Sequence, residues 1–435
     1  MIPQDNFIIV AKIDPVQLDK LRSLLKTMTF ADRTGIADPA NPLVPFGDFD
    51  TIHFARFVVL ADNTLNDRAA YRDADPQLPC SEPSYLCFMA DCDGSADELL
   101  ARMAQKPDGL RRIFGHCIRF DEAADLLGWL RVRRVEPAAS YVNWVGRSVG
   151  QVLDEARLHC LLRGALPGIE EAEPQKILAR LHELIKLPKR PTPPTPLAWY
   201  IRNLSHLLLP FVLAAACLAL FPVITIVLLG VGSVLYVIAL RRHEQTDKIV
   251  EQRYDADWVA ELRRGEDHDV TNQYTAMGSM KPGRFRLWSE IAILYGINWV
   301  ARHIFTRGSL ARIGTIHFAH WVLLDRGRRA FFCSNYDGGH EAYMDDFINK
   351  AGFGLNLSFS SGIGYPTTNW LLARGAWLEQ EFKHFQRRHQ IPTDVWYKAY
   401  PGLTAHDLAR NSRIRNGFEK PAMSDDEIRR WLAEI

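Results

Sequence analysis

The chain has 435 residues, 24% of them charged, and a net charge of +1. This balance excludes a general nucleic-acid-binding protein, because such proteins need a basic surface to bind phosphates. Apolar residues make up 47% of the chain, which excludes disorder as its main state. Seven cysteines with no Cys-x-x-Cys pair exclude a disulfide scaffold and the common zinc-ribbon and haem-attachment motifs.

The first part of the chain predicts a short α+β unit. Asp14-Pro15 is a typical helix start, because aspartate caps the free N–H groups and proline fits the first helical position. Gly146-Arg-Ser148-Val-Gly150 fits the Gly-x-Ser-x-Gly pattern, and Ser148 is read either as a helix cap or as a hydrolase nucleophile. The predicted strands are 7–13, 51–60, 85–90 and 141–145, and the predicted helices are 16–28 and 95–104.

The middle of the chain predicts a membrane segment after a proline-rich linker at 188–197. Leu207–Leu240 is 34 residues long without a charge, far beyond the 18 that suggest a transmembrane helix. As one helix it would measure about 51 Å, against a hydrocarbon core of about 30 Å. Pro222 therefore indicates two helices, at about 199–220 and 222–240, with a single span or a re-entrant wedge as alternatives.

The last part of the chain repeats blocks of the first. Thr51–Val58 matches Thr315–Val322, and Phe88–Gly94 matches Phe332–Gly338, in the same order. Matches that keep their order indicate an internal duplication. The predicted elements here are a helix at 284–305, strands at 315–324 and 330–334 around a turn at 325–327, helices at 341–350 and within 370–390, and a strand at 395–399.

The element order of each copy is typical of a ferredoxin-like unit. Such a unit leaves one sheet face open, so two copies can bury their open faces against each other. We therefore predict an α+β fold of two ferredoxin-like repeats that form a fused dimeric α/β barrel, interrupted by a transmembrane helical hairpin. The predicted parts are the first repeat with a helical extension (1–187), the linker (188–197), the hairpin (198–242), the second repeat (243–423) and a C-terminal helix (424–435).

Catalytic candidates gather in the second copy, where we expect any functional cavity. His317, Tyr336 and Asp337 could form an acid–base site, because imidazole and carboxyl groups at a strand end can exchange protons with a ligand. The alternative is structural: satisfied histidines, and an Asp337 that caps the following helix. Strand alternation places His53 with Ala55, and puts His317 and His320 on opposite faces; a pseudo-twofold could still bring His53 and His317 to one cavity.

Two resemblances add expectations. The strings Lys281–Arg286, Thr315–Ala319, Ser334–Gly338 and Trp396–Tyr400 are similar to a family of bacterial membrane-linked proteins of unassigned activity, over about residues 270–418. The duplicated plan and the Asp-Gly block more distantly resemble the dye-decolourising peroxidase superfamily, which implies haem bound at a Gly-x-x-Asp-Gly motif; Ser334 replaces its first glycine. The candidate haem-contacting residues are His317, His340, His320 and Arg56.

Together these observations predict a membrane-anchored barrel that binds a small, mostly apolar molecule and could act as a haem-dependent or other oxidoreductase. The alternative is a scaffold or sensor that docks a protein partner. Basic residues on both sides of the apolar block place both soluble parts in the cytoplasm, at the inner (plasma) membrane, because positive flanks stay on that side. We expect the lipid bilayer and a small apolar ligand as partners, and no nucleic acid.

Overall fold

The computed structural model describes residues 1–73, 75, 81–121, 123, 125–186, 194–251, 253 and 255–435. Residues 188–193 of the proline-rich linker lie outside these described residues. The helices are α1 Leu18–Lys26, α2 Ala96–Ala104, α3 Pro107–Phe114, α4 Leu126–Val132, α5 Val149–Ala165, α6 Pro174–Leu184, α7 Leu197–Leu220, α8 Pro222–Thr246, α9 Ala256–Arg263, α10 Arg284–His303, α11 His340–Phe359, α12 Glu379–His389, α13 Ala405–Phe418 and α14 Asp425–Leu432. The strands are β1 Gln4–Lys12, β2 Ile52–Leu60, β3 Tyr85–Asp93, β4 Ala139–Val142, β5 Thr271–Ser279, β6 Ile316–Leu324, β7 Arg329–Asp337, β8 Thr368–Asn369, β9 Ala373–Arg374 and β10 Val395–Lys398.

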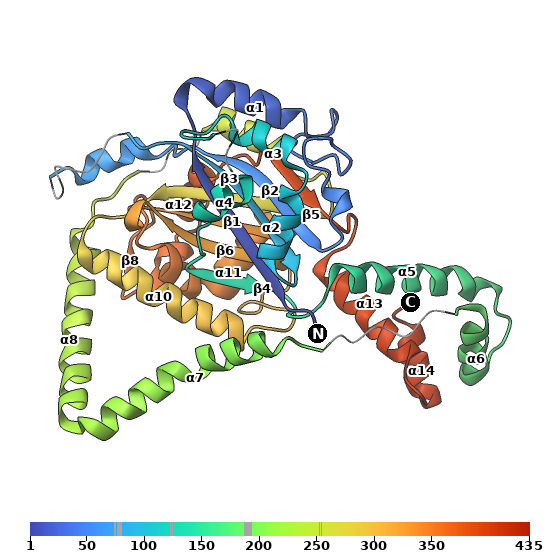
Figure 1. Cartoon of the computed structure of the whole chain (residues 1–435). Helices are drawn as coiled ribbons and strands as arrows, with labels where there is room; N and C mark the ends of the chain where they lie inside the picture. Colours follow the sequence, from blue (N-terminus) through green and yellow to red (C-terminus); the bar gives the residue numbers. More distant parts are fainter. Residues whose placement is uncertain are drawn as a thin grey trace.

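Two antiparallel four-stranded sheets form the centre of the molecule, in the orders β1-β3-β2-β10 and β5-β7-β6-β4 (Figure 1). Each sheet is completed by a strand from the other half of the chain. Strand β10 pairs with β2 through Trp396 and Arg56, and β4 pairs with β6 through Ser140 and His320. The sequence predicted both short strands but not this exchange of partners.

The two halves match strand by strand. Strands β2 and β6 hold the same place in their sheets, and both carry a bulge, at His53 and at His317. The helices after β4 and β10 also begin alike, with a cap by Ser148 and by Thr404. Ser148 accepts a hydrogen bond from the backbone of α5, so the helix-cap interpretation of the Gly-x-Ser-x-Gly pattern is confirmed.

The inner faces of the sheets pack on each other and the outer faces carry helices. Apolar side chains such as Val58, Met89, Val322 and Phe331 fill the interface between the sheets. Helices α1 to α4 cover the outer face of the first sheet, and α10 to α12 cover that of the second. Hydrophobic burial on both faces explains why the central strands are apolar throughout.

A separate group of helices lies to one side of the sheets, at the right of Figure 1. Helix α5 packs along α13, and α6 packs against α14. Their shared core includes Leu158, Leu162, Leu181, Ile414 and Trp431. The two helices that follow the exchanged strands thus hold each other.

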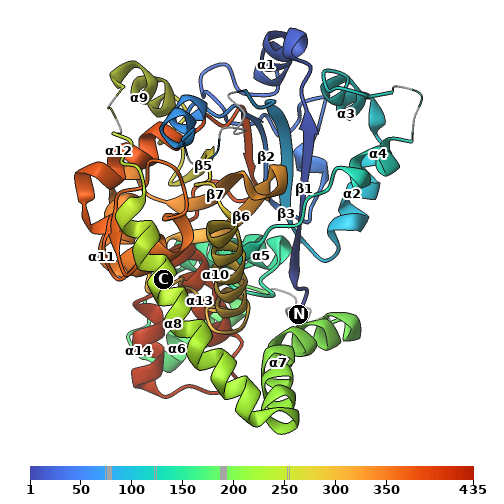
Figure 2. The same cartoon turned by 90° about the vertical axis from the view of Figure 1, so that its left-hand side faces the viewer.

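Helices α7 and α8 form a V that projects from the body (Figures 1 and 2). Both are long and apolar enough to cross a membrane, and the most apolar windows of α7 and α8 are 0% and 6% buried. The break between them is at Phe221-Pro222, as predicted. Both free ends contact the body, through His206 Nδ1 and His303 Nε2 (2.9 Å) and through Glu244 and Thr368 (2.8 Å). The fold is therefore a mixed α+β arrangement of antiparallel sheets with two long apolar helices.

Candidate functional site

Two histidine–aspartate pairs occupy equivalent positions in the two halves. His53 Nε2 is 3.0 Å from Asp93 Oδ1, and His317 Nε2 is 2.7 Å from Asp337 Oδ1. The side chains are at most 8% exposed. The structure thus brings His317 and Asp337 together and shows a matching pair in the first half.

Each aspartate also holds the start of a helix. Asp93 Oδ2 accepts a 2.8 Å hydrogen bond from the backbone N–H of Val149 in α5, and Asp337 Oδ2 accepts one of 2.7 Å from Ala405 in α13. Asp337 therefore holds the start of α13, whereas the sequence suggested α11. Burial alone raises the pKa of Asp337, but the charge and hydrogen bond of His317 outweigh it and hold the pKa below its ordinary value.

The bulges change the faces on which the histidines lie. His53 packs against Phe318 and Tyr400 in the interface between the sheets, not beside Ala55 on the outer face. Strand alternation predicted the outer face and is wrong here, because a bulge inserts one residue and reverses the pattern beyond it. His317 contacts Phe54 in the same interface.

His53 and His317 line one small cavity, together with Tyr400. The Oη atom of Tyr400 is 3.2 Å from Nδ1 of His53. The cavity volume is about 20 Å³, enough for about one water molecule. The pairs could shuttle a proton, but this conformation leaves no room for a substrate between them.

Arg56 and His320 form hydrogen bonds between the two sheets. The terminal nitrogens of Arg56 donate to the carbonyl oxygens of Tyr274 and Ser334 and to the side chain of Asn335. His320 Nε2 is 2.7 Å from Asp91 Oδ1 in the other sheet, and Nδ1 is 2.9 Å from Ser140 Oγ. His320 thus faces the same interface as His317, which corrects the prediction of opposite faces.

Tyr336 and His340 lie on the far side of the second sheet. The ring of Tyr336 stacks on Tyr343 at 3.8 Å, within the core beneath α11. The ring of His340 lies 5.9 Å from Tyr274, and burial lowers the pKa of His340. Neither the Tyr336 hydroxyl nor the His340 ring nitrogens have a hydrogen-bond partner in the described part of the chain. The sheet therefore separates them from His317.

The residues predicted to contact haem do not form a haem site. Both ring nitrogens of His320 and the terminal nitrogens of Arg56 are already bonded. His317 lines a cavity of about 20 Å³, room for about one water molecule and far too small for a porphyrin. His340 lies beyond the sheet. Among the described residues, no group of three or more His, Cys, Asp or Glu could hold a metal ion.

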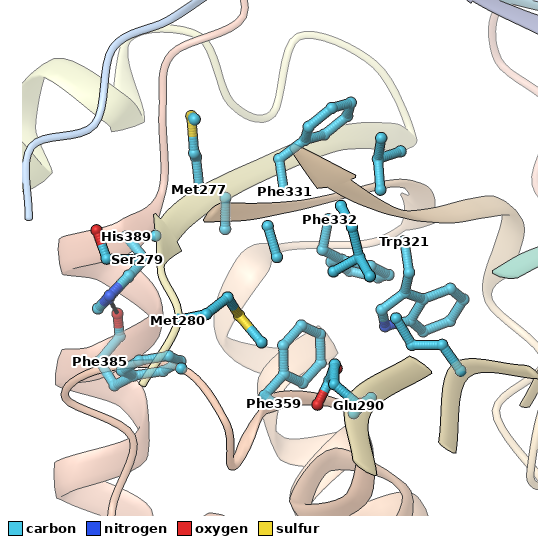
Figure 3. A pocket seen from close by; sticks show the side chains of 18 of the residues that line it. Met277, Ser279, Met280, Glu290, Trp321, Phe331, Phe332, Phe359, Phe385 and His389 are labelled. Carbon is cyan, nitrogen blue, oxygen red and sulfur yellow. Dashed lines mark hydrogen bonds between the residues drawn. The ribbon is translucent and has the colours of Figure 1, made fainter. Parts of the chain in front are cut away.

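A larger cavity lies between the outer face of the second sheet and helices α10, α11 and α12 (Figure 3). Its volume is about 50 Å³, room for roughly three or four water-sized groups. Most of its wall is apolar and includes Met280, Leu294, Phe332, Phe359 and Phe385. This cavity lies in the second half of the chain, where the sequence placed any functional cavity.

Three buried polar side chains in this wall each keep an atom without a hydrogen-bond partner among the described residues: Oε2 of Glu290, Nε1 of Trp321 and Nε2 of His389. Their exposed fractions are 2%, 7% and 5%. Figure 3 shows Glu290 and Trp321 at one end of the cavity and His389 at the other. A buried polar atom without a partner is costly, so the three atoms mark places for a polar group or water.

The protonation states of this cavity follow from burial. Burial raises the pKa of Glu290 to about 8, so the carboxyl is neutral at pH 7. Burial also lowers the pKa of His389. Because His389 Nδ1 donates to the carbonyl oxygen of Phe385 at 2.8 Å, the neutral ring presents Nε2 as an acceptor. The cavity thus offers the indole N–H as a donor, an imidazole acceptor and a neutral carboxyl group.

The sequence analysis missed these three residues. One signal was available, because Glu290 is the single acidic residue of the strongly apolar helix α10. No sequence signal marks Trp321 or His389, which come from β6 and α12. The chain matches no protein-family model and no curated protein.

Proposed function

We propose that the protein is a membrane-anchored binding protein for a small, mostly apolar molecule that carries a hydroxyl or carbonyl group. The observation that carries this proposal is the apolar cavity with unpaired polar atoms on Glu290, Trp321 and His389. Such a cavity favours an uncharged ligand, because both titratable groups are neutral at pH 7. The α7–α8 hairpin anchors the protein beside a source of apolar molecules.

The proposal includes the finer fold and the location predicted from sequence. The equivalent strand orders and bulges of the two sheets support two ferredoxin-like repeats in a fused dimeric α/β barrel with exchanged strands. Lys186, Arg241, Arg242 and Lys248 lie near the ends of the hairpin. Positive charge at both ends supports a cytoplasmic position for the body, at the inner membrane.

The test uses Trp321→Phe, with Trp288→Phe as the matched control. Trp288 lies on α10 and is 61% exposed. The full-length protein is titrated with a series of small alcohols and ketones, and binding is followed by calorimetry. Trp321→Phe should weaken binding about fivefold, the value of one hydrogen bond of about 1 kcal/mol.

The unliganded variant provides a second readout. Trp321→Phe removes an unpaired N–H but also part of a buried ring, so it should lower the melting temperature of the free protein by the cost of a small void, and ligand should then raise that temperature less than in the wild type. Trp288→Phe should change neither the melting temperature nor the ligand affinity. The proposal fails if the protein binds none of the series, or if both tryptophan variants lose the same affinity.

The neutral carboxyl of Glu290 predicts a pH dependence. A carboxyl with a raised pKa favours folding at low pH, and this advantage is lost as the pH rises from the unfolded value of about 4.3 to the folded value of about 8. Glu290→Gln, which stays neutral, should therefore become more stable than the wild type across this range, with a limiting slope of about 1.4 kcal/mol per pH unit. Urea unfolding at pH 5, 6.5 and 8 measures the difference; equal differences at all three values would contradict a buried neutral carboxyl.

A further inference from the structure

A polar cleft of about 840 Å³ opens where the membrane hairpin meets the body. Its walls are the first turns of α7, the end of α10 and the edge strands β1 and β4. Figure 1 shows the start of α7 running below the end of α10 at this place. The cleft is separate from the apolar cavity of Glu290, and it is the larger of the two.

Three arginines that line the cleft, Arg202, Arg302 and Arg307, form no salt bridge among the described residues. Arg302 Nε donates to Asn203 Oδ1 at 2.8 Å. Burial lowers the pKa of Arg302 and the charge of Arg202 lowers it further, while the charge of Asp5 opposes the shift only in part. An anion bound at Arg302 would relieve the repulsion from Arg202.

The acidic residues of the cleft already have partners. Asp97 and Glu136 each bind Arg134, at 3.2 and 3.0 Å. Asp5 Oδ2 accepts a 3.1 Å hydrogen bond from the backbone N–H of Ala96. None of these carboxylates forms an ion pair with Arg202, Arg302 or Arg307, so the guanidinium groups remain available to a ligand.

The ion pairs at the other end of the hairpin, the C-terminal end of α8, are different. There Arg241 pairs with Glu244 at 3.1 Å, and Lys281 pairs with Asp247 at 2.8 Å. At the end of α8, Arg241, Lys281 and Arg286 are thus all ion-paired, the last two sharing Asp247, whereas the three arginines of the cleft at the start of α7 form no ion pair with described residues.

The cleft also borders the start of the long apolar run of α7. Trp199 and Leu207 line it, and Leu207 is the first residue of the uncharged run. Tryptophan and arginine at the start of a membrane helix typically lie in the headgroup layer. Below the cleft, Phe211 packs against Trp299 and continues the apolar surface.

We infer that this cleft binds the headgroup of an anionic phospholipid, with the phosphate oxygens on Arg202, Arg302 and Arg307 and the acyl chains along the apolar side of α7. Basic pockets beside membrane helices bind anionic headgroups in this way, because the guanidinium fork matches phosphate and the helix supports the chains.

The test is native mass spectrometry of the full-length protein in detergent, titrated with phosphatidylglycerol and, separately, with phosphatidylcholine. We expect the anionic lipid to bind at least tenfold more tightly. Arg302→Gln should lower this affinity about tenfold, and Arg202→Gln, an exposed position with little effect on folding, should also lower it. Arg242→Gln is the matched control, because it removes the same charge at the C-terminal end of α8, away from the cleft.

Several results would overturn the inference. One is equal affinity for the two lipids, and another is an equal loss in Arg242→Gln and in the cleft variants. Inorganic phosphate serves as the soluble competitor. If it displaces the lipid at an equal concentration, the site recognises a free anion and not a lipid.

Discussion

Beside the small cavity between the sheets, two equivalent carboxylates each join three segments of the chain. Asp337 at the end of β7 binds His317 on the bulge of β6 and the first N–H of α13. Asp93 does the same with His53 and α5. Because α5 and α13 follow the exchanged strands, each carboxylate ties a helix back to the sheet of its own half.

The first residue-scale prediction concerns this contact. Asp337→Asn should destabilise the protein by about 2 kcal/mol at pH 7, because hydrogen bonds to an ionised group contribute about 1.5–3 kcal/mol each. Asp97→Asn is the control, because the Asp97 side chain is 54% exposed and an exposed ion pair contributes less than about 1 kcal/mol. Urea unfolding compares the two variants.

The same variant has a defined pH dependence. The pKa of Asp337 is lowered in the folded protein, so its contribution is present above the unfolded value of about 3.9 and is lost as the pH falls through the folded pKa. The difference between wild type and Asp337→Asn should thus be constant from pH 5 to 7 and shrink below about pH 4. A difference that grows on acidification would show that the carboxyl is not held ionised.

At the scale of elements, the α7–α8 hairpin has a fixed relation to the body. The break at Phe221-Pro222 follows from the missing N–H of proline and from a run too long for one span. Contacts of His206 and Glu244 bring both ends to the same body. Two crossings or a re-entrant wedge would satisfy this arrangement, and a single crossing would not.

The element-scale prediction is topological. Reporter tags inserted after Pro194 and after Lys248 should both be inaccessible to reagents added outside intact cells, as expected for cytoplasmic sites. A tag inserted after Phe221 should read the opposite side, because the turn emerges there in a two-span hairpin. Opposite readings at Pro194 and Lys248 would exclude the hairpin, and a protected Phe221 tag would indicate a re-entrant wedge.

At the scale of the whole molecule, exchange of β4 and β10 makes the halves interdependent. Without β10, one edge of β2 has no partner strand. Without β4, one edge of β6 has none. An unpaired apolar edge strand is prone to aggregation. The contacts between the halves join residues far apart in the sequence. The backbone N–H of Val59, for example, donates to the carboxylate of Asp394, 335 residues later.

This interdependence predicts the behaviour of separated halves. Residues 1–186 and 247–435 expressed alone should each be insoluble or rapidly proteolysed. Expressed together they should co-purify in a 1:1 ratio with protected sheet amides in hydrogen exchange, because the exchanged strands re-form without the hairpin. A soluble half with protected amides in β2 or β6 would contradict a requirement for the exchange.

Strong local patterns determined much of this fold. The sequence predicted seven of the eight strands of the two sheets and both long apolar helices, because apolar periodicity, caps and long apolar runs act between neighbouring residues. It missed β5, whose Gln273 and Thr275 are polar yet buried. Such polar positions become compatible with a buried strand only through partners elsewhere in the fold, as when Thr275 receives a hydrogen bond from Arg56.

The candidate sites depended on the tertiary structure. The blocks containing His317 and Asp337 were visible in the sequence, but the bulge that turns His317 toward the interface was not, because the same residues fit a regular strand. The apolar cavity joins Glu290, Trp321 and His389 from three elements. Sequence by itself thus determined most elements and the two long apolar helices. The strand partners, the faces of the histidines and both cavities were decided by contacts between residues far apart in the chain, which no local pattern encodes.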